Sequence, residues 1–201
     1  EQKGRIIQIS GIDGAFEKEF ETDIGSHIVI SSKDNSKLFV SNIESNSVSI
    51  IHLDNGQVDT IDTPAGPEGI GLSPDESELW VLCHQENKVV VIDLNFRKIL
   101  HEFSSEGDFP IKMTFINDEV WVNNVAGRNV AIFDMITKKF KEKIDLETTP
   151  LGILSDNSYV YVTLPRWNLL KVFDVVTRKE IASFESGIEP DGMALFPKNS
   201  H

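Results

Sequence analysis

The sequence has only one cysteine, no long apolar run and no initiator methionine. Because Cys83 is alone, no disulfide can form within the chain, and its place in an apolar run predicts a small buried side chain. A single cysteine does not indicate whether the chain belongs to an oxidising or a reducing compartment. A membrane helix needs about 18 consecutive apolar residues, and no stretch approaches that length. The start, Glu1–Arg5, also lacks the apolar core of a signal peptide, so we expect a mature, processed or partial chain.

Basic residues are also few. The 201 residues include 19 Lys and Arg against 32 Asp and Glu, which gives a net charge of −13. A surface that binds phosphates needs clustered Lys and Arg, so we expect no nucleic acid partner. The basic stretch 128–143 alternates with Phe140 and Ile144, which predicts a solvated outer edge for its lysines. With 40% hydrophobic and 25% charged residues, the chain has the composition of a folded globular protein.

Several motifs of catalytic or metal chemistry are missing. No H-E-x-x-H spacing, C-x-x-C-H or G-x-S-x-G occurs. The segment 11–14 (GIDG) is a hairpin signal and not a phosphate cradle, because no helix follows it. Isolated histidines at strand ends are more often hydrogen-bonded surface residues than ligands. The histidines are His27, His52, His84, His101 and His201.

What the sequence does have is an internal repeat. One apolar motif begins at residues 38, 79, 120 and 160, so the repeat is about 41 residues long. The four copies are Leu38–Asn42, Leu79–Cys83, Val120–Asn124 and Val160–Leu164. We expect repeats near 38–78, 79–119, 120–159 and 160–198.

Each repeat predicts four short strands. A polar turn containing Asn follows the first motif, and a second apolar run ends at His52, Asp93, Asp134 or Asp174. A third segment alternates apolar and polar residues, as in 139–144, which is typical of a half-buried strand. A loop with Pro67, Pro110, Pro150 or Pro190 then leads into a fourth apolar segment. Because no helical period is sustained, the pattern predicts an all-β fold built from β-propeller blades.

The two ends of the chain fall inside blades. Residues 4–20 align with 87–103, so the chain begins with the third and fourth strands of a blade. It ends after one further strand near 189–195. We therefore expect residues 1–201 to form a single propeller domain of four complete blades with partial blades at both ends. We expect it to be an excerpt of a propeller of about seven blades, with a closed ring of five blades as the alternative.

The repeat resembles the YVTN β-propeller family. The segment 161–164 (YVTL), its relatives 39–42 (FVSN) and 121–124 (WVNN), and 66–75 (GPEGIGLSPD) carry the resemblance, which covers nearly the whole chain. It departs at Leu82-Cys83, at Leu164-Pro165 and at His52. The family includes surface-layer proteins and YncE-like secreted or periplasmic proteins, so the resemblance implies an extracytoplasmic location.

The recurring Asp and Asn residues have a structural interpretation. Asp93, Asp134 and Asp174 stand where a strand meets a tight turn, and an Asp there accepts hydrogen bonds from the turn amides. The same argument covers Asn46, Asn87 and Asn168. The alternative is a ligand set, which we consider the weaker interpretation.

The resemblance implies a candidate site at a mouth of the propeller channel. The residue after each loop proline would converge there from different blades, joined by Ser26 or His27 from a weaker copy of the motif. Glu68 and Asp191 could bind Ca²⁺, which prefers oxygen ligands, or raise one another's pKa. Ile111 and Leu151 weaken a metal site, because they leave two blades without a donor. The alternative is that all these side chains are solvated. The candidates are Glu68, Asp191, His27, Ile111 and Leu151.

These observations favour a binding or scaffold propeller that recognises a protein or saccharide through its channel mouth or rim. No catalytic residues, cofactor or transmembrane segment are predicted, and the oligomeric state is left open. One alternative is a metal-dependent enzyme resembling gluconolactonase or streptogramin lyase, with Glu68 and Asp191 as metal ligands. Another is a partner subunit of a redox enzyme.

Overall fold

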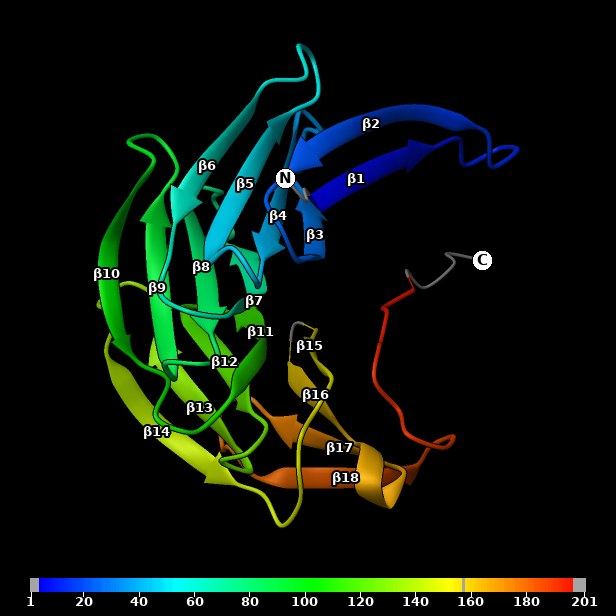
Figure 1. Cartoon of the computed structure of the whole chain (residues 1–201). Coiled ribbons are helices and arrows are strands. Elements are labelled where there is room, and N and C mark those ends of the chain that lie inside the picture. Colours follow the sequence, from blue (N-terminus) through cyan, green and yellow to red (C-terminus); the bar gives the residue numbers. More distant parts are fainter. Residues whose placement is uncertain (1–3, 157, 197–201) are drawn as a thin grey trace. The chain divides into compact units, whose positions relative to one another are not determined.

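The computed structural model describes residues 4–156 and 158–196, and it confirms an all-β fold (Figure 1). The chain divides into two compact units, 1–104 and 105–201. Every strand pair is antiparallel, and in each four-stranded sheet the strands lie side by side in chain order. This meander is the blade that the repeat predicts.

The first unit contains a two-stranded sheet and two blades. The two-stranded sheet pairs β1 (Gly4–Ile9) with β2 (Phe16–Thr22), as expected for the last two strands of a blade. The first blade comprises β3 (Ser26–Ser31), β4 (Lys37–Asn42), β5 (Ser47–His52) and β6 (Val58–Asp62). The second comprises β7 (Pro67–Leu72), β8 (Glu78–Cys83), β9 (Lys88–Asp93) and β10 (Lys98–Ser104).

The second unit contains two further blades. The third blade comprises β11 (Pro110–Ile116), β12 (Glu119–Asn124), β13 (Asn129–Asp134) and β14 (Phe140–Asp145). The fourth comprises β15 (Ile153–Ser155), β16 (Tyr159–Leu164), β17 (Leu169–Asp174) and β18 (Glu180–Glu185). A short 3-10 helix, η1 (Pro165–Trp167), lies between β16 and β17.

The sheets are out of phase with the sequence repeat by one strand. Repeat 38–78 supplies β4, β5 and β6 to the first blade, but its last strand, β7, is the first strand of the second blade. The loop prolines therefore stand at the entry to each blade. The predicted strand near 189–195 does not form, because the described chain has no strand after β18 with which it could pair.

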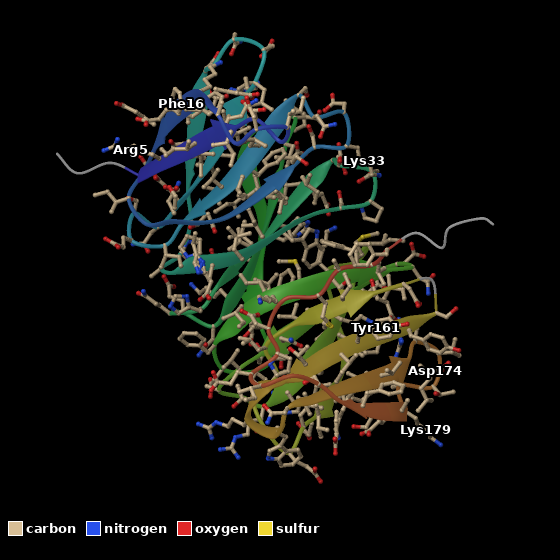
Figure 2. The ribbon with its side chains drawn as sticks, turned by 90° about the vertical axis from the view of Figure 1, so that its right-hand side faces the viewer. Arg5, Phe16, Lys33, Tyr161, Asp174 and Lys179 are labelled. Atoms are coloured by element: carbon tan, nitrogen blue, oxygen red, sulfur yellow. The ribbon has the colours of Figure 1, made fainter. Side chains whose placement is uncertain are left out.

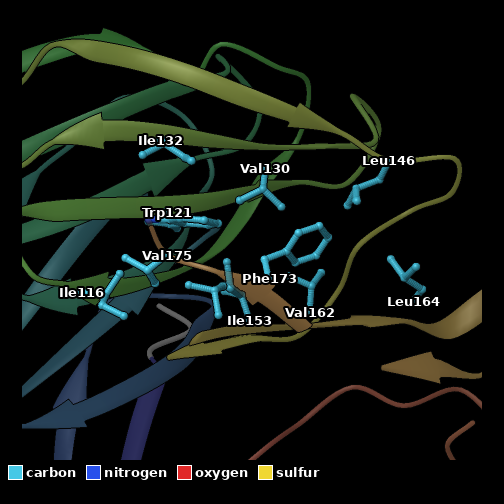
Figure 3. Close-up of a cluster of buried hydrophobic side chains, with 11 residues drawn as sticks. Ile116, Trp121, Val130, Ile132, Leu146, Ile153, Val162, Leu164, Phe173 and Val175 are labelled. Carbon is cyan, nitrogen blue, oxygen red and sulfur yellow. The ribbon is translucent and has the colours of Figure 1, made fainter. Parts of the chain in front are cut away.

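The core lies between the faces of neighbouring blades, and the two central strands of each blade carry most of it. In the second unit, Trp121 and Val130 of the third blade pack against Val162 and Phe173 of the fourth (Figure 3). Cys83 belongs to the core between the first and second blades, and burial raises the pKa of its thiol to about 12. The prediction of a small buried side chain at Cys83 is therefore confirmed.

Polar residues of the repeat tie one blade to the next. The Ser41 hydroxyl donates to the carbonyl oxygen of Glu68 at 2.9 Å, which joins β4 to the first strand of the following blade. Asn123 holds the equivalent position in β12, and its Nδ2 donates to the carbonyl oxygens of Leu151 and Gly152, both at 3.2 Å. In the first and third blades, the third residue of the YVTN-like motif is thus a latch to the following blade.

The structural interpretation of the strand-end Asp is confirmed. Asp93 Oδ1 accepts from the backbone N–H groups of Asn95 and Phe96, both at 2.8 Å. Asp174 Oδ1 accepts from the backbone N–H of Thr177 at 2.7 Å and from its hydroxyl at 2.8 Å. These bonds to Thr177 lower the pKa of Asp174. Figure 2 labels Asp174 and Lys179, the two ends of this turn, whose backbones are joined by a hydrogen bond of 3.0 Å.

Candidate functional site

In the first unit, the candidate Glu68 lies on β7 and is paired with a histidine. Glu68 Oε2 lies 3.2 Å from Nδ1 of His84, and the two side chains are only 19% and 11% exposed. Gly66, at a φ of +73°, packs so closely on the imidazole that a Cβ there would lie 2.9 Å from His84 Cε1. The imidazole is thus held between the loop that enters the blade and the Glu68 carboxylate.

The other candidate of this unit, His27, is exposed on β3. Ser41 links the two strands, because its hydroxyl accepts from the Ile28 N–H at 3.2 Å and donates to the Glu68 carbonyl oxygen. The side-chain chemistry of this region therefore rests on the carboxylate–imidazole pair of Glu68 and His84. Such a pair can hydrogen-bond a polar ligand.

In the second unit, the candidate Asp191 is exposed and forms an ion pair with Lys112 of β11. Its carbonyl oxygen passes so close to Gly152 that a Cβ there would lie 2.1 Å away, so a residue with a side chain cannot replace this glycine without a backbone shift. Ile111 is buried at 4% exposure and Leu151 is half-buried, so both are packing residues.

The metal candidates Glu68 and Asp191 therefore each face a nitrogen that competes for the carboxylate. Across residues 4–156 and 158–196, no three His, Cys, Asp or Glu side chains gather in a way that could hold a metal ion. His84 and Lys112 were not foreseen from the sequence. Lys112 is 79 positions from Asp191, and only the packing of strands brings such residues together.

A charge cluster that the sequence did not reveal lies around Glu119. This carboxylate, 8% exposed, accepts from Nζ of Lys141 at 2.5 Å and from Nε1 of Trp121 at 3.1 Å, and it pairs with Arg178 of the next blade. The Lys141 side chain is nevertheless 41% exposed, which agrees with the solvated outer edge predicted for the lysines of 128–143. Arg97 makes a similar contact in the first unit, with Asp59 of the preceding blade at 2.6 Å.

Large apolar side chains are exposed at the turns. Phe96 is 72% exposed in the β9–β10 turn, and Ile136 and Val176 are 69% and 85% exposed in the corresponding turns of the third and fourth blades. Trp167 is 45% exposed in η1, whereas Trp80 and Trp121 are fully buried. These side chains contribute little to the cores of their units, so their apolar surface is available for contacts outside the fold.

Solved structures share this fold at low sequence identity. Hydrazine synthase from Kuenenia stuttgartiensis matches with a TM-score of 0.73 and 20% identity, over 87% of this chain and 52% of its own. A structure of U3-55K matches with a TM-score of 0.72 and 11% identity, over 90% of this chain and 54% of its own. The WD40 repeats of RRP9 match with a TM-score of 0.73 and 10% identity, over the same shares. The chain thus spans about half the length of these structures.

No curated protein sequence matches the chain. Within the described residues, no helix has the length and apolar character needed to cross a membrane. The model of the YNCE-like beta-propeller family matches residues 3–115, which is more than half of the chain. The repeat, the four-stranded blades and this match agree, and the chain belongs to the YNCE-like β-propeller family.

Proposed function

We propose that the chain is a binding or scaffold module that recognises a protein or saccharide partner through the channel mouth or rim of the propeller. The observation that carries the proposal is the exposure of large apolar side chains at turns, such as Phe96, Ile136 and Val176. Aromatic side chains are enriched at recognition surfaces, and turns on a rigid β scaffold are common places for them. The proposal locates the partner outside the cytoplasm, on the family resemblance alone.

The mouth candidates support recognition of a polar ligand. The Glu68 carboxylate lies 3.2 Å from the imidazole of His84, and the Asp191 carboxylate forms an ion pair with Lys112. Such pairs can offer a donor and an acceptor side by side to hydroxyl, amide or carboxylate groups. The likeness to hydrazine synthase and to WD40 repeats concerns the fold, and a fold does not select among binding, metal and redox roles.

The proposal is tested with a rim variant in which Phe96, Ile136 and Val176 are changed to Ser. Binding is measured on a glycan array and by cross-linking in an extract of the source organism, followed by titration with each partner found. We expect the rim variant to lose at least one partner that the unchanged chain binds stoichiometrically. A control variant changes the exposed lysines Lys139 and Lys179 to Ser and should keep it.

A catalytic role would be revealed by a different result. Isothermal titration with Ca²⁺ and Zn²⁺ would show stoichiometric binding, and metal-dependent hydrolysis of a lactone would be lost in Glu68→Ala. That pair of results would overturn the proposal, as would a purified protein that binds no partner on the array or in the extract.

A further inference from the structure

The turn between β16 and β17 differs from its counterparts in the other blades. It consists of η1 followed by Asn168, whose φ of 54° lies in the left-handed region. The counterparts at 43–46, 84–87 and 125–128 also end in a left-handed residue, with φ between 50° and 53°. The fourth blade thus keeps the left-handed end of the turn and changes the residues before it to Pro165, Arg166 and Trp167.

In the first two blades, the residue equivalent to Trp167 accepts a hydrogen bond that stabilises the fold. Ser45 Oγ accepts from the backbone N–H of Ile24 at 2.8 Å. Glu86 Oε1 accepts from the backbone N–H of Ala65, also at 2.8 Å. Both bonds fasten the loop that enters the blade. An indole has a donor and no acceptor, so Trp167 cannot make this bond.

The neighbouring Asn168 keeps its structural task. Its Oδ1 accepts from the N–H of Glu189 at 3.0 Å, just as Asn46 Oδ1 accepts from the N–H of Gly66 at 2.9 Å in the first blade. The departure from the repeat therefore lies in the residues before Asn168, of which Arg166 and Trp167 are exposed. Because Trp167 cannot accept the hydrogen bond that Ser45 and Glu86 accept, its exposed aromatic surface indicates a role in binding another molecule.

Charged residues surround the turn. Arg166 precedes Trp167, the bond to Asn168 brings Glu189 beside the turn, and Glu185 of β18 pairs with Leu169 at the start of β17. The guanidinium can donate hydrogen bonds, and the two carboxylates can accept them. The turn thus presents one flat apolar surface with donors and acceptors around it.

We propose that Trp167 and Arg166 form a saccharide-binding surface, an assignment that rests on the binding function proposed above. A pyranose ring has an apolar C–H face that stacks on an indole, and its hydroxyl groups hydrogen-bond to charged side chains at the edge. A protein interface of ordinary size buries about 800 Å² on each partner around a cluster of apolar residues. Trp167, even with the exposed Ile188 nearby, is a smaller apolar cluster than such an interface uses, and an indole with charged residues beside it fits a sugar better.

The test uses the whole chain and a panel of neutral oligosaccharides of glucose, mannose, galactose and N-acetylglucosamine. Binding is followed by calorimetry and by the change in tryptophan fluorescence, since a bound saccharide can contact Trp167 but not Trp80 or Trp121, which are fully buried. We expect one saccharide class to bind saturably and to shift the emission. Trp167→Ser, which copies Ser45, should raise Kd about tenfold or more. Trp167→Tyr should keep most of the affinity, and Arg166→Gln should weaken it.

Two controls show whether the loss of affinity belongs to the indole of Trp167. Phe16→Ser removes another exposed aromatic side chain, on β2, and should leave saccharide binding unchanged. Thermal unfolding of Trp167→Ser should match that of the unchanged chain, because the indole makes no bond to the incoming loop. The assignment is wrong if no neutral saccharide binds, or if Trp167→Ser binds as tightly as the unchanged chain.

A protein partner would give another pattern. Such a partner would also use Ile188, which is 88% exposed near Glu189, so both Trp167→Ser and Ile188→Ser would weaken its binding while no saccharide bound. That outcome would overturn the saccharide assignment and leave the proposed binding function standing. If the unchanged chain bound neither a saccharide nor a protein, the proposed function itself would be contradicted.

Discussion

Glu119 is the residue around which the charges of the second unit gather. Burial alone would raise the pKa of its carboxyl, but hydrogen bonds from Lys141 and Trp121 and the charge of Arg178 outweigh it, so the pKa lies below its ordinary value. The Arg178 guanidinium also stacks over the Trp121 ring, with its carbon 5.1 Å from the ring centroid. Because Arg178 belongs to the fourth blade and Glu119 to the third, this contact fastens two blades.

Glu119→Gln is expected to destabilise the protein by about 2 kcal/mol or more, because it removes the buried counter-charge of Arg178 and leaves only the half-exposed Glu142. The matched control is Glu142→Gln. Glu142 also pairs with Arg178, at 2.9 Å, but it is half exposed and should cost less than about 1 kcal/mol. Urea unfolding measures both variants. Equal losses would show that the burial of Glu119 adds nothing to the contact.

At the scale of the strand, the latch residues Ser41 and Asn123 join neighbouring blades through their side-chain hydrogen bonds. Asn123→Ala removes the donor to the carbonyl oxygens of Leu151 and Gly152 and should cost about 1–3 kcal/mol, because these groups lie where water cannot replace the bond freely. Lys139→Ala, an exposed control in the same blade, should stay within about 0.5 kcal/mol. Thermal or urea unfolding measures the difference. An Asn123→Ala variant as stable as the control would contradict the latch.

The strands, the turns and the strand-end Asp were predictable because each follows from a local pattern that recurs, four times for the strands and three times for the Asp. Asp93 and Asp174 bond to residues two or three positions away, which the sequence displays directly. The phase of the blades was not predictable in the same way. A 41-residue period has no marked beginning, and only hydrogen bonding assigns β7 to the second sheet.

The candidate site was only partly predictable. The sequence located Glu68 and Asp191 after their prolines, but their partners His84 and Lys112 follow from packing between strands and loops. Trp167 gave a usable signal, since Leu164-Pro165 departs from the repeat immediately before it. The sequence alone does not show that residues at this position bind the loop that enters the blade. That follows from the hydrogen bonds of Ser45 and Glu86 in the structure, which an indole cannot accept.

At the scale of the whole molecule, acidic turns link stability to pH. Hydrogen bonds from Ser32 and Ser36 lower the pKa of Asp34 from 3.8 to about 2, and Ser73 and Ser77 do the same for Asp75. Asp134 and Asp174 are lowered by bonds from Thr137 and Thr177. In each case the folded chain favours the ionised carboxylate. The stability they contribute is present above the ordinary pKa and is lost as pH falls toward the folded one.

A second effect acts in the opposite direction. The net charge is −13 at pH 7, so the negative side chains repel one another in the folded chain. As the pH falls, the solvated carboxylates become protonated before the hydrogen-bonded ones, which reduces this repulsion. We therefore expect the melting temperature to hold or rise slightly from about pH 7 to about pH 5, and to fall steeply between about pH 4 and about pH 2. Circular dichroism melts at constant ionic strength measure the profile.

The variant that isolates the acidic turns is Asp75→Asn. An amide at this position loses the charge-assisted bonds to Ser73 and Ser77, so the variant should melt below the unchanged chain at neutral pH. It no longer titrates, so the difference should shrink as pH falls through the range in which Asp75 itself becomes protonated. A difference that stays constant down to about pH 2 would mean that this carboxylate does not couple folding to protonation. The acid sensitivity would then come from the other turns, at Asp34, Asp134 and Asp174, or from repulsion between the basic side chains, which carry the remaining charge once the carboxylates are neutral.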